Sequence, residues 1–215
     1  MSDHSAHVAH QFDDATQQYE ASTLGMWAFL ITEIMFFGGL FAGFFVYILG
    51  HAQAFAEGSR HLDLALGTVN TVVLLGSSLT MALAVRSAQQ GNRNGQLLFL
   101  MLTIALGVVF LGIKGVEYAH KFEQHLVPGP HFRMDGSHGQ SAQLFFSFYF
   151  AMTGVHALHM VVGIGLLAWL LVNAWRGKYS AAYFTPVEVS GLYWHFVDVV
   201  WIFLFPTLYL VARHG

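Results

Sequence analysis

Residues 24–45 read LGMWAFLITEIMFFGGLFAGFF, and Glu33 is the only charged residue among them. A helix needs about 20 consecutive apolar residues to cross a hydrocarbon core about 30 Å thick, so this stretch is long enough to span a membrane. The whole chain is 55% hydrophobic and only 10% charged. Because a soluble domain carries about 25% charged residues, the composition also places the chain among membrane proteins.

Four further apolar segments follow along the chain of 215 residues. The five predicted spans are about 23–49, 64–85, 95–119, 141–172 and 187–211. The segments between them concentrate glycine, proline, asparagine and most of the charges, as membrane-protein loops do. We see no repeat of solenoid length and no second domain. The predicted fold class is therefore all-α, a polytopic membrane bundle of five transmembrane helices over residues 23–215.

Residues 1–22 form a polar, acidic tail without lysine or arginine. A secretory signal begins with a basic region and a short apolar core, so this tail does not resemble one. We expect it to lie outside the membrane and to be partly disordered. His4, His7 and His10 would share one face, and could bind a metal, only if the tail were helical. A solvated tail is the simpler interpretation.

Two further features of the composition limit the function. The chain has no cysteine, which excludes disulfides, iron–sulfur clusters and thiolate metal sites. A net charge of −3 with neutral histidine argues against a role in binding nucleic acid. Lysine and arginine divide equally between the two sides of the predicted bundle. The short basic loops around residues 86–93 and 176–178 favour their side as cytoplasmic, with the N-terminus inside and the C-terminus outside.

Ionisable residues inside the predicted spans need partners, because a charge in hydrocarbon costs several kcal/mol. They are Glu33, Lys114, Glu117, His156, His159, Glu188, His195 and Asp198. A helical rise of about 1.5 Å per residue places Glu33 and His159 at similar depth, which predicts a hydrogen bond between them. His195 and Asp198 are three residues apart on one helix face, with Glu188 two turns back. They are predicted to form a second polar cluster.

Lys114 and Glu117 have the same spacing near the end of the third span, and we interpret them as an ion pair at the interface, with the lysine stem snorkelling. For the other residues three interpretations stay open: a structural network between helices, a proton relay, and ligation of a metal or haem. His156 and His159 share one helix and cannot be opposite axial ligands, whereas His159 with His195 is geometrically compatible with haem. The structural network is the simplest of the three.

Five segments have distinctive sequences: LGMWAFLITEIMFFGGLFAGFF, VNTVVLLGSSLTMALA, LGVVFLGIKGVEYAHKF, YFAMTGVHALHMVVGIGLL and VSGLYWHFVDVVWIFLFPTLYL. In this order they closely resemble subunit III of the haem–copper cytochrome c oxidases, in its short five-helix bacterial form. The resemblance covers residues 24–210, and TGVHALHMVVG and YWHFVDVVWIFLF are its most specific parts. Many relatives have two more helices at the start, which form one arm of a lipid-filled cleft. Another subunit is expected to supply that wall here.

The resemblance assigns roles position by position. Glu33 matches the membrane-embedded carboxylate of the family, and Arg176 and Lys178 fall where the family has basic residues near phospholipid headgroups. No catalytic residue and no metal ligand is implied in this chain. The other matching positions are Asn70, Glu117, Tyr118, His156, His159, Glu188, Trp194, His195 and Asp198.

The resemblance implies an accessory subunit without a redox centre of its own, in the bacterial inner membrane. Haem and copper would lie in partner subunits I and II. Subunit I would be the main contact of this chain, and further partners would be subunit II, small subunits, membrane lipids and a respiratory supercomplex. The complex would transfer electrons from cytochrome c to oxygen, while this chain stabilises subunit I and binds phospholipid. The alternatives are subunit III of a quinol oxidase or of a nitric-oxide-reducing relative, an independent proton channel, and a membrane cytochrome that binds haem b.

Overall fold

The structure is a computed structural model that describes residues 8–130, 132–134 and 139–211. Within that part of the chain, six helices follow one another and five of them, all except α2, are long and apolar enough to cross a membrane. The predicted all-α membrane bundle is therefore confirmed. The helices are α1 (Ala15–Gly50), α2 (Ala52–Arg60), α3 (Leu64–Gln89), α4 (Arg93–Glu123), α5 (Gly139–Trp175) and α6 (Thr185–Tyr209).

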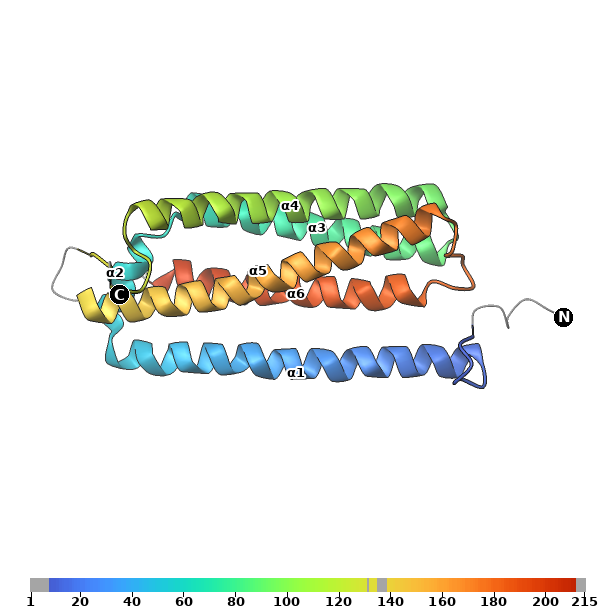
Figure 1. Ribbon diagram of the computed structural model, residues 1–215, viewed down its shortest axis with the longest axis horizontal. Helices are drawn as coiled ribbons and strands as arrows, with labels where there is room; N and C mark the ends of the chain where they lie inside the picture. The colour runs from blue at the N-terminus through green and yellow to red at the C-terminus, as the bar shows by residue number, and fades with distance from the viewer. Residues whose placement is uncertain (1–7, 131, 135–138, 212–215) are drawn as a thin grey trace.

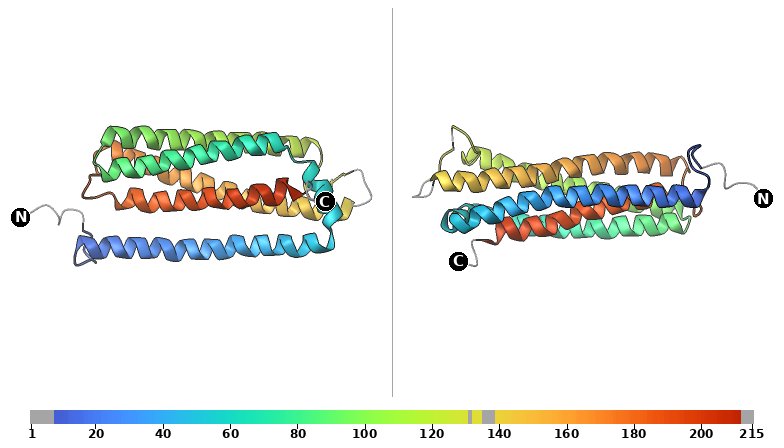
Figure 2. Two further views of the ribbon diagram at one scale, coloured as in Figure 1. Left: turned by 180° about the vertical axis from the view of Figure 1, so that it is seen from behind. Right: turned by 90° about the horizontal axis from the view of Figure 1, so that it is seen from below.

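The five long helices run roughly side by side (Figure 1). The start of α1 and the α3–α4 and α5–α6 loops lie at one end of the bundle, while α2 and the end of α6 lie at the other. α5 crosses the bundle obliquely, from α2 at its start to α4 at its end. α6 packs against α1, α3 and α5, and half of its most apolar stretch is buried, against 17% for α1. α6 is thus the central helix and α1 a peripheral one, and the left view in Figure 2 shows α1 at the edge of the bundle.

The first helix extends into the tail that the sequence predicted to be outside the bundle. α1 begins at Ala15 because Asp14 caps it: a carboxylate oxygen of Asp14 accepts a hydrogen bond from the backbone N–H of Gln17 over 2.7 Å. Residues 15–22 of the predicted tail are therefore helical and continuous with the first span. His10 lies exposed in a turn before this helix, while His4 and His7 lie outside the described residues.

The short helix α2 lies where the sequence predicted a loop. Ala54, Phe55 and Gly58 share its buried face, which packs against the start of α5. A Cβ atom at Gly58 would lie 2.4 Å from the Phe145 ring, so a glycine is needed at this contact. The Lys121 ammonium donates to the carbonyl oxygen of His61 and joins α4 to the end of α2. The spacing of these three residues fits one face of a helix, but so short a face does not stand out in a polar segment.

One buried tryptophan joins four helices. Trp194 of α6 is fully buried, and its indole N–H donates to the Ser77 hydroxyl of α3 over 3.0 Å. Its ring occupies the space left by glycines on two other helices. A Cβ atom at Gly107 of α4 or at Gly163 of α5 would lie 2.9 Å from a ring carbon of Trp194. Close approach of α4 and α5 to α6 therefore depends on these two small residues.

Candidate functional site

The predicted contact between Glu33 of α1 and His159 of α5 is present. His159 Nε2 lies 3.1 Å from a carboxyl oxygen of Glu33, and the two side chains are only 15% and 20% exposed. His159 Nδ1 lies 2.9 Å from the carbonyl oxygen of Val155, one turn earlier on α5. The Tyr193 hydroxyl of α6 donates to the carbonyl oxygen of His159 over 3.0 Å. Three helices thus meet at His159.

Both ring nitrogens of His159 are engaged in these hydrogen bonds. A histidine ligand must present a free nitrogen lone pair to a metal. The arrangement of His159 therefore disfavours its pairing with His195 as haem ligands, which the sequence had left open. Among the described residues, no group of three or more acidic or histidine side chains is arranged to hold a metal ion.

A second charged pair lies deep in the bundle. The Lys114 ammonium donates to Glu117 over 2.9 Å, to the Tyr149 hydroxyl over 3.2 Å and to the Tyr209 hydroxyl over 2.9 Å. The two tyrosine hydroxyls in turn donate to the other oxygen of Glu117, over 2.9 and 2.6 Å. All three ammonium hydrogens and both carboxylate oxygens have partners, as a buried ion pair requires.

The ion pair was predicted, but the predicted snorkelling of Lys114 is wrong. Lys114 is only 4% exposed and lies nine residues before the end of α4, about 14 Å at helical rise. Its ammonium faces aromatic rings at 5.1–5.6 Å, which adds cation–π attraction. Snorkelling is unnecessary because partners from α5 and α6 satisfy the charge. These rings belong to Tyr118, Tyr149, Trp201 and Tyr209.

Hydroxyl groups of α3 form a polar seam with α6. Each accepts from, or pairs with, a ring nitrogen of α6, and the pair nearer the start of α3 lies nearer the end of α6, as expected for antiparallel helices. The sequence did not predict this seam, because serine and threonine are neutral and common in membrane helices. The pairs are Ser78 with His195 at 2.8 Å, Ser77 with Trp194 at 3.0 Å and Thr71 with Trp201 at 3.0 Å.

The predicted cluster of His195 and Asp198 is only partly present. Their closest atoms, Nδ1 of His195 and Oδ2 of Asp198, are 3.9 Å apart, which is beyond hydrogen-bond distance. His195 instead uses Nδ1 for Ser78. Glu188 lies in the first turn of α6, and one of its buried carboxylate oxygens has no hydrogen-bond partner among the described residues. His195 and Asp198 are therefore not joined by a direct hydrogen bond.

His156 is separate from the other polar groups as well. It is 1% exposed, and its ring packs against Phe110 and Trp201 with centroids 5.5 and 5.2 Å away. Neither ring nitrogen has a hydrogen-bond partner among the residues that the structure describes. Asn70 donates to the carbonyl oxygen of Phe110 over 3.3 Å. The structure places His156 in an aromatic environment and not with His159.

The basic residues near the α5–α6 loop differ in their contacts. Arg93 donates to the carbonyl oxygens of Ala174 and Trp175 and so caps the end of α5. Arg176 and Lys178 are exposed. Burial raises the pKa of the neighbouring Tyr179 to about 12, so this phenol stays neutral and does not offset their charge. Two positive charges therefore remain accessible at this end of the bundle.

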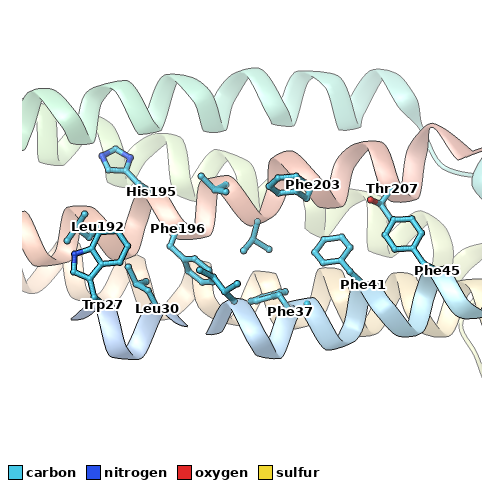
Figure 3. A pocket seen from close by; sticks show the side chains of 14 residues that line it. Trp27, Leu30, Phe37, Phe41, Phe45, Leu192, His195, Phe196, Phe203 and Thr207 are labelled. Carbon is cyan, nitrogen blue, oxygen red and sulfur yellow. The ribbon is translucent and has the colours of Figure 1, made fainter. Parts of the chain in front are cut away.

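An apolar groove of about 570 Å³ separates parts of α1 and α6. Figure 3 shows aromatic side chains of both helices facing it. His195 lines it and Glu33 does not, so the Glu33–His159 contact lies outside the groove. The labelled residues that line the groove are Trp27, Leu30, Phe37, Phe41, Phe45, Leu192, His195, Phe196, Phe203 and Thr207.

The fold and these internal pairs define a polytopic membrane protein whose buried polar groups join its helices. The family model described as "Cytochrome c oxidase subunit III" matches residues 4–213, so the chain belongs to this family of haem–copper oxidase subunits. The resemblance seen in the sequence is thereby confirmed. The chain is one component of an oxidase complex with other subunits.

Curated relatives have similar lengths and two kinds of name. "Cytochrome c oxidase subunit 3" of Thermostichus vulcanus is 33% identical, over 94% of this chain and 92% of the relative. The protein of the same name from Corynebacterium diphtheriae is 35% identical, over 88% and 87%. "Probable quinol oxidase subunit 3" of Staphylococcus haemolyticus is 32% identical, over 96% and 97%.

Proposed function

We propose that this chain is the accessory, non-redox subunit of a terminal oxidase complex, in which it stabilises subunit I and retains phospholipid. The observation that carries the proposal is that two pairs of intramembrane ionisable residues are joined by hydrogen bonds, Lys114 with Glu117 and Glu33 with His159. The Lys114–Glu117 pair is fully hydrogen-bonded, and both ring nitrogens of His159 are engaged. Groups satisfied in this way hold helices together, which supports a structural role for these residues.

The same contacts support this role over that of an independent proton channel. Proton transfer across a membrane needs a continuous series of hydrogen-bonding groups. Here the Glu33–His159 pair, the Lys114 cluster and the α3–α6 seam are joined within themselves, and no hydrogen bond links one to another among the described side chains. The channel interpretation predicts proton flux into liposomes that contain only this chain, and we expect none.

We propose cytochrome c as the electron donor of the complex. Relatives named for cytochrome c and for quinol have nearly equal identity to this chain, so their names do not separate the two donors. Support comes from the sequences KGVEY and YWHFVDVVW, which resemble those of subunit III in the oxidases that use cytochrome c. A dinuclear copper signal from the copurified subunit II would support this donor, and its absence would favour quinol.

Affinity purification of the chain from its native membrane tests the accessory role. We expect a haem-containing subunit I to copurify, the haem spectrum to survive removal of this chain, and activity to decline faster during turnover without it. Haem bound to the chain after separation from the other subunits would refute the non-redox assignment.

We further propose the bacterial inner membrane as the location of the chain, with the N-terminus in the cytoplasm.

Lipid binding is proposed at the exposed pair Arg176 and Lys178. Native mass spectrometry of the purified complex should show anionic phospholipid that is lost when both residues are changed to glutamine. Arg60→Gln is the matched control, because Arg60 is exposed at the opposite end of the bundle. Equal lipid loss in the control and in the double variant would contradict the proposed site.

A further inference from the structure

The hydrogen bonds of His159 determine where its protons lie. The Val155 carbonyl oxygen has no hydrogen to donate, so His159 Nδ1, 2.9 Å away, must carry the hydrogen of that bond. A neutral imidazole has only one N–H, and here it is used at Nδ1. Nε2 of neutral His159 is therefore an acceptor, and it faces a carboxyl oxygen of Glu33 at 3.1 Å.

This contact needs one proton between its two atoms. Either a protonated Glu33 donates to neutral His159, or imidazolium His159 donates to the Glu33 carboxylate. Both arrangements have the same proton count and no net charge. Without this proton, a carboxylate would face a nitrogen lone pair inside the membrane, where an unpaired charge costs several kcal/mol. We propose that Glu33 and His159 hold one shared proton, and that this proton fastens α1 to α5.

The peripheral position of α1 explains why such a fastening matters. α1 is the least buried of the long helices, and the groove next to it leaves part of its contact with α6 unfilled (Figure 3). Near Glu33 its other contacts are between aromatic rings: Phe37 with Phe196 and Phe29 with Tyr193, each with centroids 6.1 Å apart. Ring contacts of this kind are weak and allow sliding, whereas the hydrogen bond fixes one register.

Few other groups that titrate face the pair. From α6, Tyr193 stacks on His159 with centroids 6.5 Å apart and donates its hydroxyl hydrogen to the His159 carbonyl oxygen. On α5, His156 lies about one turn away, within aromatic neighbours. On α1, the Thr32 hydroxyl is used by the Phe29 carbonyl oxygen. The shared proton is therefore held by Glu33 and His159 themselves.

Spin labels on α1 and α5 of the intact complex test the proposal. The chain has no cysteine of its own, and Met35 and Leu158, 72% and 61% exposed, accept labels after replacement by cysteine. At neutral pH we expect one narrow distance distribution between the labels. At alkaline pH the proton is removed, and the distribution should broaden. Labels at Leu79 of α3 and Leu102 of α4 are the control and should keep their distance over the same range.

Two variants at Glu33 distinguish the shared proton from general instability. In Glu33→Gln the amide donates to His159 Nε2 without a titratable proton, so the distribution should stay narrow at alkaline pH. In Glu33→Leu the bond is lost, and the distribution should be broad at every pH. Broadening of Glu33→Gln at the same pH as the unmodified chain, or a narrow distribution for Glu33→Leu, would overturn the proposal.

Infrared spectroscopy gives an independent readout of the proton. The difference between the unmodified complex and Glu33→Gln at neutral pH should contain either a protonated carboxyl band or a carboxylate band together with imidazolium. A carboxylate band together with neutral imidazole would refute the shared proton. None of these outcomes depends on the electron donor or on the accessory role, so the inference can fail while the proposed function stands.

Discussion

Lys114→Met should release this chain from its complex at a lower temperature. Methionine has a similar length and an unbranched chain, so it fills the same space between α4, α5 and α6 without the ammonium. The variant leaves Glu117 buried beside two tyrosine hydroxyls and without the ammonium that contacts it. Removing one partner of a buried pair costs about 3–5 kcal/mol. At about 1.4 kcal/mol per factor of ten, the loss exceeds about 100-fold in a folding or assembly equilibrium.

The matched variants are Glu117→Gln and the double change Lys114→Met with Glu117→Gln. The first leaves a buried ammonium without its carboxylate, and we expect a loss of similar size. The double variant removes both charges, so it should be less destabilised than the sum of the single variants and close to or better than either of them.

The assay is retention of this chain in the purified complex, measured by gel filtration after brief heating in mild detergent. The haem spectrum provides a control that the redox subunits are intact. Additive losses in the double variant would refute the conclusion that the two residues form one buried pair. Retention of Lys114→Met at the temperature of the unmodified complex would refute the stated cost.

Two further predictions use the same assay. Gly163→Ala places a methyl group against the Trp194 ring and should lower the free energy of unfolding by about 1–3 kcal/mol. Gly165→Ala is the control, because its methyl group would point into open space and should change stability little. Equal effects of the two variants would contradict the packing described for Trp194. Ser78→Ala and His195→Ala should each lower the free energy of unfolding by about 0.5–1.5 kcal/mol. The double variant should lose little more than either single variant, because both substitutions remove the same hydrogen bond. Fully additive losses would mean that the two residues act separately.

Much of the fold could be predicted because each membrane span is a long run of apolar residues in the sequence. The ends were less predictable, since a helix continues into polar sequence wherever a cap and water stabilise it. Asp14 starts α1 inside a segment that composition alone assigns to a tail. α2 was missed because its short buried face only becomes apparent once Gly58 is seen against Phe145.

The internal contacts were predictable only where depth decides them. α1 and α5 run in opposite directions, and counting residues along each helix places Glu33 and His159 at similar depth. The surroundings of Lys114 depend on which face of α4 meets α5 and α6, which no count of depth provides. His195 was assigned to Asp198 because both can carry charge, whereas its partner Ser78 is neutral and resembles many other serines in membrane helices.

The contact between Glu33 and His159 has a consequence for synthesis of the chain. The two residues are 126 positions apart, and the helices that α1 packs against in the membrane, α5 and α6, are the last to be made. At about 5–20 residues per second, Glu33 waits roughly 6–25 s before His159 is synthesised. During that time its carboxyl group must stay protonated or use a temporary partner. The first helix to enter the membrane is therefore among the last to reach its final place.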